Sequence, residues 1–200
     1  DSYLREEYGV ESKILLEFEK LYIKFFTPPQ RGSKGGAKKR YAGLIETSDG
    51  QDIDFVGLEY VRRDWTEAAK KFQKALLWRV FNNEPVEEYV RSFVEELRDG
   101  EHDEDLVYTK GLTKAPADYT KTTPQHVKAA LKLDDFSGNV ISYYVTVDGP
   151  EPVSARTHSI DYDHYIEKQI KPIAESILSV LNKNFYDVMH GTEQLDLSSF

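Results

Sequence analysis

The chain has 200 residues, no cysteine and a formal net charge of −9 at pH 7. Without cysteine it can form no disulfide framework, no thiolate metal site and no thiol nucleophile. Its sequence contains no apolar run that approaches the roughly 20 residues of a membrane span. Hydrophobic residues make up 40% of the chain, which is enough to bury the core of one ordinary domain or two small ones.

The first 62 residues are predicted to be rich in β-structure. Apolar and polar residues alternate through residues 13–27, which predicts a long strand with a bend or bulge where the alternation slips once. Residues 41–46 and 52–61 are typical of two further strands, and the turn residues 48–51 between them predict a hairpin.

A glycine-rich basic loop lies between the first two of these segments. It is not a P-loop, because the glycines lead to Ala37 and three basic residues rather than to Gly-Lys followed by Ser or Thr. The loop is either a solvated basic turn or an element that presents lysines to phosphates and groove edges. The net negative charge disfavours nucleic acid, but a basic strip on an acidic body can still bind DNA. The cations that fall together without an intervening acid are Arg31, Lys34, Lys38, Lys39 and Arg40.

From about residue 63 the pattern becomes mostly helical. Asp64 is predicted to cap a helix of about four turns, with Glu67 as its capping-box partner. This helix should end at Asn82 or Asn83, and a second helix should end at Gly100, a common C-cap residue.

Three more elements are predicted towards the C-terminus. A third helix follows Pro124, and residues 139–147 form a strand. Asp161 or Asp163 caps a last long helix, which Pro172 should kink or split because proline cannot donate a backbone hydrogen bond.

Candidate metal ligands and catalytic groups are few. The segment HSIDYDHY offers His158, Asp161, Asp163 and His164, but on a helix start the last two point in different directions. We therefore predict a capped helix and no metal site. The sequence contains no pattern that indicates a Ser/His/Asp catalytic triad, so we predict no catalytic residues in this chain.

Five segments, taken in order, resemble family B DNA polymerases. Lys38-Lys39-Arg40-Tyr41 resembles the basic K-K-x-Y motif of that family, and GLEYVRRDW resembles its junction between palm and thumb. The segments DYTKTTPQHVKAAL, NVISYYV and DYDHYIEKQIKPIAESIL resemble a thumb segment, a following strand and the C-terminal helix.

This resemblance, strongest to bacterial members of the family, implies a C-terminal fragment with an α+β fold. Residues 1–62 would be a small antiparallel β portion of the palm, residues 63–190 a mainly α-helical thumb, and residues 191–200 a flexible tail. The absence of an initiator Met fits an excised fragment. The parent enzyme would act in replication or repair in the bacterial cytoplasm, at the nucleoid.

The resemblance also implies that the chain grips primer–template duplex DNA. Lys38 and Lys39 would contact the minor groove and backbone, with Tyr41 beside the primer terminus. Minor-groove acceptors are nearly the same for every correct base pair, so a lysine there can sense pairing without reading sequence. For the thumb positions, ordinary solvated lysines are the alternative. The predicted DNA-binding residues are Lys38, Lys39, Arg40, Tyr41, Lys114, Lys121 and His126.

The family's chemistry requires two aspartates that hold two metal ions, from the motif Y-G-D-T-D-S and an earlier palm motif. Neither motif occurs in this sequence. We expect no cofactor in this fragment, Mg²⁺ in the full-length parent, and no polymerase activity from the fragment alone.

The C-terminal residues suggest a second function. Gln194, Leu195, Leu197 and Phe200 resemble the peptide that binds the bacterial sliding clamp, although Phe200 stands two residues later than in the short form. An ordinary polar tail is the alternative. The competing overall interpretation is therefore a protein-interaction module that tethers its parent to a clamp.

Overall fold

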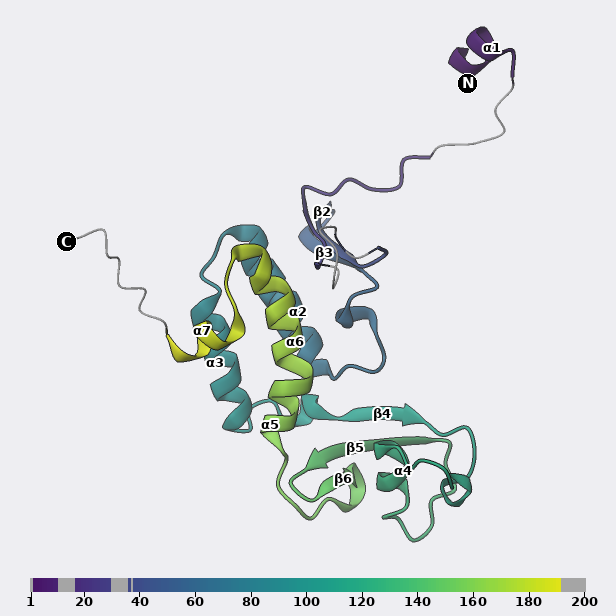
Figure 1. Ribbon diagram of the computed structural model, residues 1–200, viewed down its shortest axis with the longest axis vertical. Coiled ribbons are helices and arrows are strands. Elements are labelled where there is room, and N and C mark those ends of the chain that lie inside the picture. Colours follow the sequence, from purple (N-terminus) through teal and green to yellow (C-terminus); the bar gives the residue numbers. More distant parts are fainter. Residues whose placement is uncertain (1, 11–16, 30–35, 37, 192–200) are drawn as a thin grey trace, which may run out of the picture.

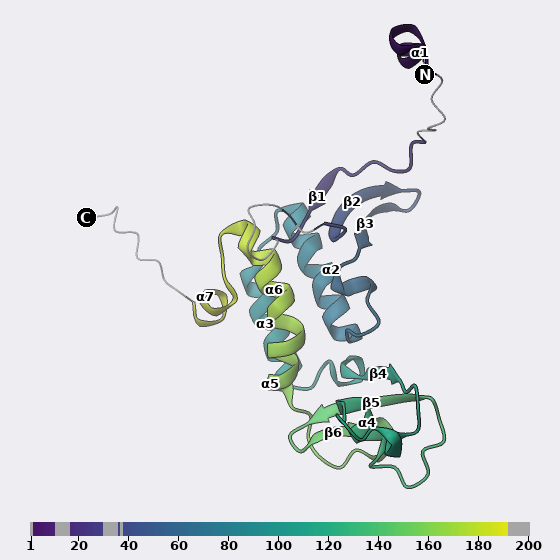
Figure 2. The same ribbon diagram turned by 45° about the vertical axis from the view of Figure 1, so that its right-hand side comes forward.

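The computed structural model of the chain describes residues 2–10, 17–29, 36 and 38–191. Over these residues, the structure contains a group of helices and two three-stranded antiparallel sheets, one beside the upper part of α2 (Glu67–Asn82) and the other below the lower ends of the helices (Figures 1 and 2). A short helix, α1 (Ser2–Tyr8), lies apart from the rest of the molecule in both views. The predicted α+β class is confirmed.

The first sheet has the strand order β1 (Lys24–Phe26), β2 (Tyr41–Thr47) and β3 (Gly50–Val56). The predicted hairpin is confirmed as the β2–β3 pair, in which Leu44 is opposite Ile53. Alternate side chains enter the core because successive residues of a strand face opposite sides of the sheet. The buried residues of this sheet are Phe26, Ala42, Leu44, Ile53 and Phe55.

The long strand predicted for residues 13–27 is wrong over the part that the structure describes. Only Lys24–Phe26 is a strand, residues 17–23 are not, and residues 11–16 lie outside the described residues. Phe18 and Leu21 are 84% and 70% exposed, so no described element covers the alternating apolar face. A strand needs a partner for its backbone groups, and only residues 24–26 pair with β2.

The strand predicted for residues 52–61 ends earlier than expected. Gly57 has a φ of +64°, in the left-handed region, and this turns the chain out of the sheet. The next residues form a short 3₁₀ helix, η1 (Glu59–Val61).

The group of helices contains α2 (Glu67–Asn82) and α3 (Glu87–Arg98), as predicted. The left-handed Asn83 ends α2. The predicted cap, however, is wrong: the Thr66 side chain accepts the hydrogen bond from the Ala69 N–H, whereas Asp64 pairs with Arg62 at 2.7 Å. Thr66 is favoured because its N–H also reaches the buried Gln169 side chain, at 3.1 Å.

The second sheet has the order β4 (Tyr108–Gly111), β5 (Val140–Thr146) and β6 (Gly149–Pro152). The sequence predicted β5 but missed its two partners. Both are only four residues long, and β6 contains two prolines, so neither shows a strand pattern by itself. The helix predicted after Pro124 is α4 (Gln125–Ala130), which packs on β5 and β6.

The last long helix is divided, as Pro172 predicted. It consists of α5 (Tyr162–Tyr165), a π-helical turn η5 (Ile166–Ile170) and α6 (Lys171–Leu178). Pro172 has no N–H to donate to the carbonyl group four residues earlier, which disfavours a regular α-helical turn just before it. Asp161 caps α5 by accepting from the His164 N–H at 3.0 Å.

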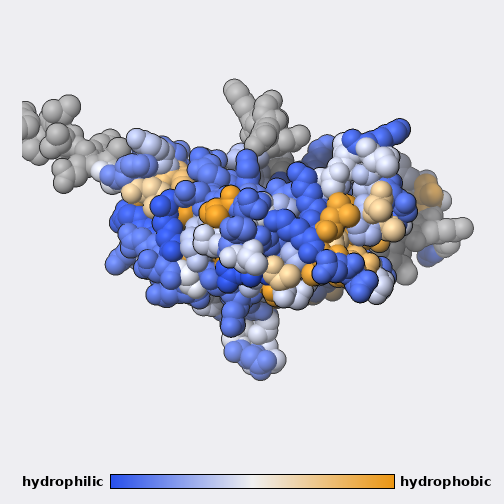
Figure 3. Space-filling model, turned by 90° about the horizontal axis from the view of Figure 1, so that it is seen from below, coloured by the Kyte–Doolittle hydropathy of each residue, from blue (hydrophilic) through white to orange (hydrophobic). Residues whose placement is uncertain are grey.

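Short elements complete the described chain. They are η2 (Asp103–Leu106), η3 (Pro116–Asp118), η4 (Val153–Ala155), η6 (Ser179–Leu181) and α7 (Phe185–His190). Among the described helices, none has the length and apolar character needed to span a bilayer. The end of the molecule seen in Figure 3 is mostly hydrophilic, with small separate apolar patches.

Candidate nucleic-acid interface

The basic turn that precedes β2 carries Lys38 and Lys39, and both are exposed. Neither lysine forms an ion pair with another residue of the described chain. Lys39 has a φ of +58°, and a Cβ atom on Gly57 would lie 2.2 Å from the Lys39 carbonyl oxygen. The turn is therefore packed tightly against the residue that follows β3, while its two ammonium groups remain available to solvent.

Arg40, the next residue, is partly exposed but is paired within the protein. Its guanidinium group forms an ion pair with Glu59, whose side chain is only 12% exposed. Glu59 also accepts a hydrogen bond from the Gln73 side-chain amide at 2.8 Å. The predicted DNA-binding residues of this turn thus differ in environment: two lysines are open and the arginine is paired.

Tyr41 belongs to a cluster of aromatic side chains beside the turn. Its ring stacks on Phe25 at 5.1 Å between centroids and meets the edge of Tyr22 at 5.9 Å. The Tyr22 hydroxyl donates to Asp54 at 2.6 Å. Burial and the Asp54 hydrogen bond raise the pKa of Tyr22, while the Tyr22 hydrogen bond lowers the pKa of Asp54 despite its burial. These contacts fix the position of Tyr41 at the start of β2.

A second group of predicted residues lies in the connection between β4 and α4 and in the first turn of α4. The Lys114 ammonium group lies over the Tyr119 ring, 4.6 Å from its centroid, and His126 meets the same ring edge-to-face at 6.5 Å. Burial and the charge of nearby Lys110 lower the pKa of His126, which favours the neutral imidazole at pH 7. The structure therefore brings Lys114 and His126 together around Tyr119. Lys121 is exposed.

The two groups of residues belong to different sheets, which lie towards opposite ends of the helices. The turn with Lys38 and Lys39 leads into β2 of the first sheet, and the second group adjoins α4 on the second sheet (Figures 1 and 2). A ligand that contacts both groups must therefore extend along the molecule, as a duplex can.

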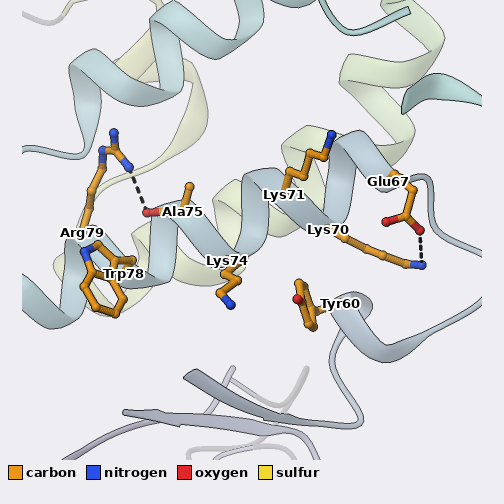
Figure 4. Close-up of a pocket in the computed structure, with 8 residues that line it drawn as sticks. All are labelled: Tyr60, Glu67, Lys70, Lys71, Lys74, Ala75, Trp78 and Arg79. Carbon is orange, nitrogen blue, oxygen red and sulfur yellow. Dashed lines mark hydrogen bonds and ion pairs between the residues drawn. The ribbon is translucent and has the colours of Figure 1, made fainter. Parts of the chain in front are cut away.

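A groove of about 660 Å³ lies along α2, close to η1 and the first sheet (Figure 4). Its cations are engaged within the fold: Lys70 pairs with Glu67 at 2.7 Å, and Lys71 pairs with Asp105 at 2.5 Å. We therefore assign it no ligand. The remaining lining residues are Tyr60, Lys74, Ala75, Trp78 and Arg79, of which Lys74 pairs with Asp52 and Arg79 lies over the Tyr89 ring.

The metal ligands considered in the sequence do not come together as a group. Asp161 caps α5, Asp163 pairs with Arg98 at 2.8 Å, and the His164 ring nitrogen lies 3.3 Å from the Tyr108 hydroxyl.

Instead, His158 meets Asp148 and Glu151, and this is the only set in the described chain with the spacing of metal ligands. The Lys132 ammonium group already lies 3.3 Å from Glu151 and 3.6 Å from Asp148. Because a cationic amine neutralises this cluster, its residues do not fit a pair of Mg²⁺ ions, and we derive no metal-dependent step from them.

Two residues of this region were missed in the sequence. Glu59 and Gln73 lie behind the basic turn, and Gln73 is a polar residue within the apolar stripe of α2, next to Phe72. A polar side chain in such a stripe is a sequence signal for a buried hydrogen-bond partner. The residues predicted to bind a clamp, Gln194, Leu195, Leu197 and Phe200, lie outside the described residues.

Comparison with known proteins gives consistent results. The family described as DNA polymerase family B matches residues 8–186. The chain is 41% identical over 191 residues to DNA polymerase II of Escherichia coli strain K12, covering 90% of this chain and 24% of that protein. It is 35% identical over 215 residues to DNA polymerase 2 of Aeropyrum pernix, covering 99% of this chain and 25% of that protein.

A solved structure extends the similarity to the fold. The family B DNA polymerase from the hyperthermophilic archaeon Pyrobaculum calidifontis has a TM-score of 0.64 and 30% identity to this chain. The similarity covers 90% of this chain and 24% of that structure. The chain thus spans about a quarter of the length of these relatives, which are both bacterial and archaeal.

Proposed function

Since this chain belongs to DNA polymerase family B, we propose that it is the part of a DNA-directed DNA polymerase that grips primer–template duplex. In this proposal residues 1–62 are the end of the palm and residues 63–190 are the thumb. The whole enzyme transfers nucleotides with Mg²⁺ held by aspartates outside this chain, and this chain contributes the grip on the product.

The observation that carries the proposal is the basic turn before β2. Lys38 and Lys39 are exposed and unpaired among the described residues, whereas Arg40 and Lys74 are engaged in ion pairs. Phosphates dominate DNA affinity, and minor-groove acceptors are shared by all correct base pairs. Two free ammonium groups on a tightly packed turn, beside the fixed ring of Tyr41, suit that target.

The second group supports an extended contact. Lys114 and Lys121 lie in the connection between β4 and α4, and His126 lies at the start of α4, where they can meet the duplex backbone further from the primer end. A neutral imidazole at pH 7 can still donate one hydrogen bond to a phosphate oxygen. In this proposal the two groups follow one duplex along the molecule.

The test is a double substitution, Lys38→Ala with Lys39→Ala, in the polymerase that contains this chain. Affinity for primed duplex should fall, and the log–log slope of affinity against salt should lose about 0.9 for each phosphate contact removed. Fluorescence anisotropy over a range of salt concentrations measures both quantities. The matched control is Lys70→Ala with Lys71→Ala, which removes the same charge from lysines that are paired on α2. If both pairs of substitutions have equal effects, the turn has no specific role.

A second proposal concerns residues 191–200, because Gln194, Leu195, Leu197 and Phe200 resemble a clamp-binding peptide. Three apolar side chains buried in a pocket contribute about 5–9 kcal/mol in total, at about 1.5–3 kcal/mol each. Ordering a flexible peptide cancels part of this gain, so we expect micromolar affinity for a bacterial sliding clamp. Such a tether would raise the effective concentration of the polymerase at the clamp.

Titration of a synthetic peptide of residues 190–200 against purified clamp measures this affinity. Substitution of Leu195→Ala and Leu197→Ala should abolish binding, while a peptide with Ser198→Ala and Ser199→Ala should bind like the native one. Absence of binding at high micromolar clamp would leave the tail without this role.

A further inference from the structure

Three polar side chains, Arg40, Glu59 and Gln73, connect the basic turn to α2. Gln73, on α2, is only 2% exposed, yet both ends of its amide are used. Its oxygen accepts from the Tyr60 N–H at 2.7 Å, and its nitrogen donates to Glu59 at 2.8 Å. The other Glu59 oxygen pairs with Arg40, the residue between Lys39 and Tyr41.

The backbone beside this chain of contacts is tightly packed as well. Gly57 and Lys39 both have left-handed φ values, +64° and +58°, and the Lys39 carbonyl occupies the space that a Gly57 side chain would need. The Tyr60 ring stacks on Phe55 at 4.2 Å between centroids, which anchors η1 to β3. Segment 57–60 therefore forms a rigid support directly behind the turn.

We propose that Gln73, Glu59 and Arg40 form a positioning relay that holds the Lys38–Lys39 turn in the geometry needed to contact DNA. The proposal rests on the proposed function, because the relay acts only through the two lysines. Within it Arg40 does not itself bind phosphate. Its charge is directed inward to Glu59, and the Nε atom of Arg40 is buried with no partner in the described chain. Movement of α2 relative to the first sheet would then change how tightly the turn grips the duplex.

The alternative is that Arg40 contacts a phosphate directly and Glu59 merely neutralises it. The two interpretations differ in how substitutions combine. If the relay acts through the lysines, breaking it should have no further effect once the lysines are gone. If Arg40 binds independently, the effects should add.

The experiment uses the full polymerase that contains this chain, with Glu59→Gln and Gln73→Met. Glu59→Gln removes the charge that faces Arg40, and Gln73→Met keeps the volume but removes both hydrogen bonds. Each should weaken binding of primed duplex about tenfold, or about 1.4 kcal/mol, with the KM for nucleotide unchanged. In the background of Lys38→Ala and Lys39→Ala, neither should weaken binding further.

The matched control is Gln169→Met, which removes another buried glutamine, whose side-chain oxygen accepts two hydrogen bonds from Thr66. It should lower the melting temperature like Gln73→Met but leave DNA affinity unchanged. If Gln73→Met does not fold, Glu59→Gln carries the test, because its side chain keeps its size.

Two results would overturn the relay. If the lysine substitutions weaken binding but the relay substitutions do not, or if their effects add, the relay is wrong and the proposed function stands. If the lysine substitutions themselves leave affinity and salt slope unchanged, the proposed function fails, and the relay fails with it.

Discussion

Glu151, on β6, is a buried carboxylate whose hydrogen bonds come from several directions. It is 3% exposed and accepts from the backbone N–H groups of Thr157 and His158, at 2.8 and 3.0 Å. Burial raises the pKa of Glu151, but the hydrogen bonds from His158, the Thr157 backbone and Lys132 outweigh it and hold the pKa well below the usual 4.5. The carboxylate therefore secures the loop after β6.

We predict that Glu151→Gln lowers the free energy of unfolding by about 1–3 kcal/mol at pH 7, because an NH₂ group replaces one of the two carboxylate oxygens and the buried donors that face it lose their acceptor. A carboxyl group whose pKa falls on folding adds stability that is fully present above its unfolded pKa and is lost as pH falls towards its folded pKa. The difference between variant and wild type should therefore shrink below pH 4.5. Denaturant unfolding between pH 3 and pH 7 measures it. A difference that does not vary with pH would contradict this role. The control is Glu167→Gln, which removes the charge of an exposed glutamate that pairs with Lys171.

At the scale of elements, the start of α2 shows how a local signal can identify the wrong residue. Asp64 and Thr66 are both good N-cap residues, and Asp64 has Glu67 at the capping-box spacing. The structure selects Thr66 because Gln169, 103 residues later, accepts hydrogen bonds from its N–H and hydroxyl groups. By contrast, the Asp161 cap and the break at Pro172 were predictable, since both depend on neighbours within a few residues.

We predict that Thr66→Ala destabilises the protein by about 1–2 kcal/mol, since it removes the cap of α2 and its hydrogen bond to Gln169. Asp64→Ala should cost less than about 1 kcal/mol, because it removes only a partly exposed ion pair with Arg62. Urea unfolding curves of the two variants test the assignment. If both variants lose the same free energy of unfolding, or if Asp64→Ala loses more, Asp64 rather than Thr66 is the N-cap of α2.

At the scale of the whole molecule, residues 17–23, which precede β1, alternate like a strand with one buried face. No other described element covers the apolar side chains of Phe18 and Leu21. Phe18 and Leu21 are largely exposed, whereas Leu44 on β2 is fully buried.

We predict that Phe18→Ser with Leu21→Ser changes the free energy of unfolding of this chain by less than about 0.5 kcal/mol for each substitution, as for other exposed sites. Leu44→Ala, the buried comparison, should cost about 2–5 kcal/mol. Chemical denaturation of the wild type, the double variant and Leu44→Ala measures these free energies of unfolding. A loss for the double variant as large as that for Leu44→Ala would mean that the segment is packed against the fold.

The sequence by itself determined the features that depend on near neighbours: the β2–β3 hairpin, the presence of α2 and α3 and the end of α2, a cap at Asp161 or Asp163, the break at Pro172 and the order of the family's segments. The remaining features depend on partners distant in the sequence. Glu59 reaches Gln73 and Arg40, Glu151 reaches Lys132, and the short strands β4 and β6 exist because β5 lies between them. Burial and hydrogen bonding between such segments are properties of the packed chain, and no local pattern encodes which distant group will satisfy a buried polar atom. The tertiary structure therefore decided which cations of the basic turn are held by the fold and which remain open to a ligand.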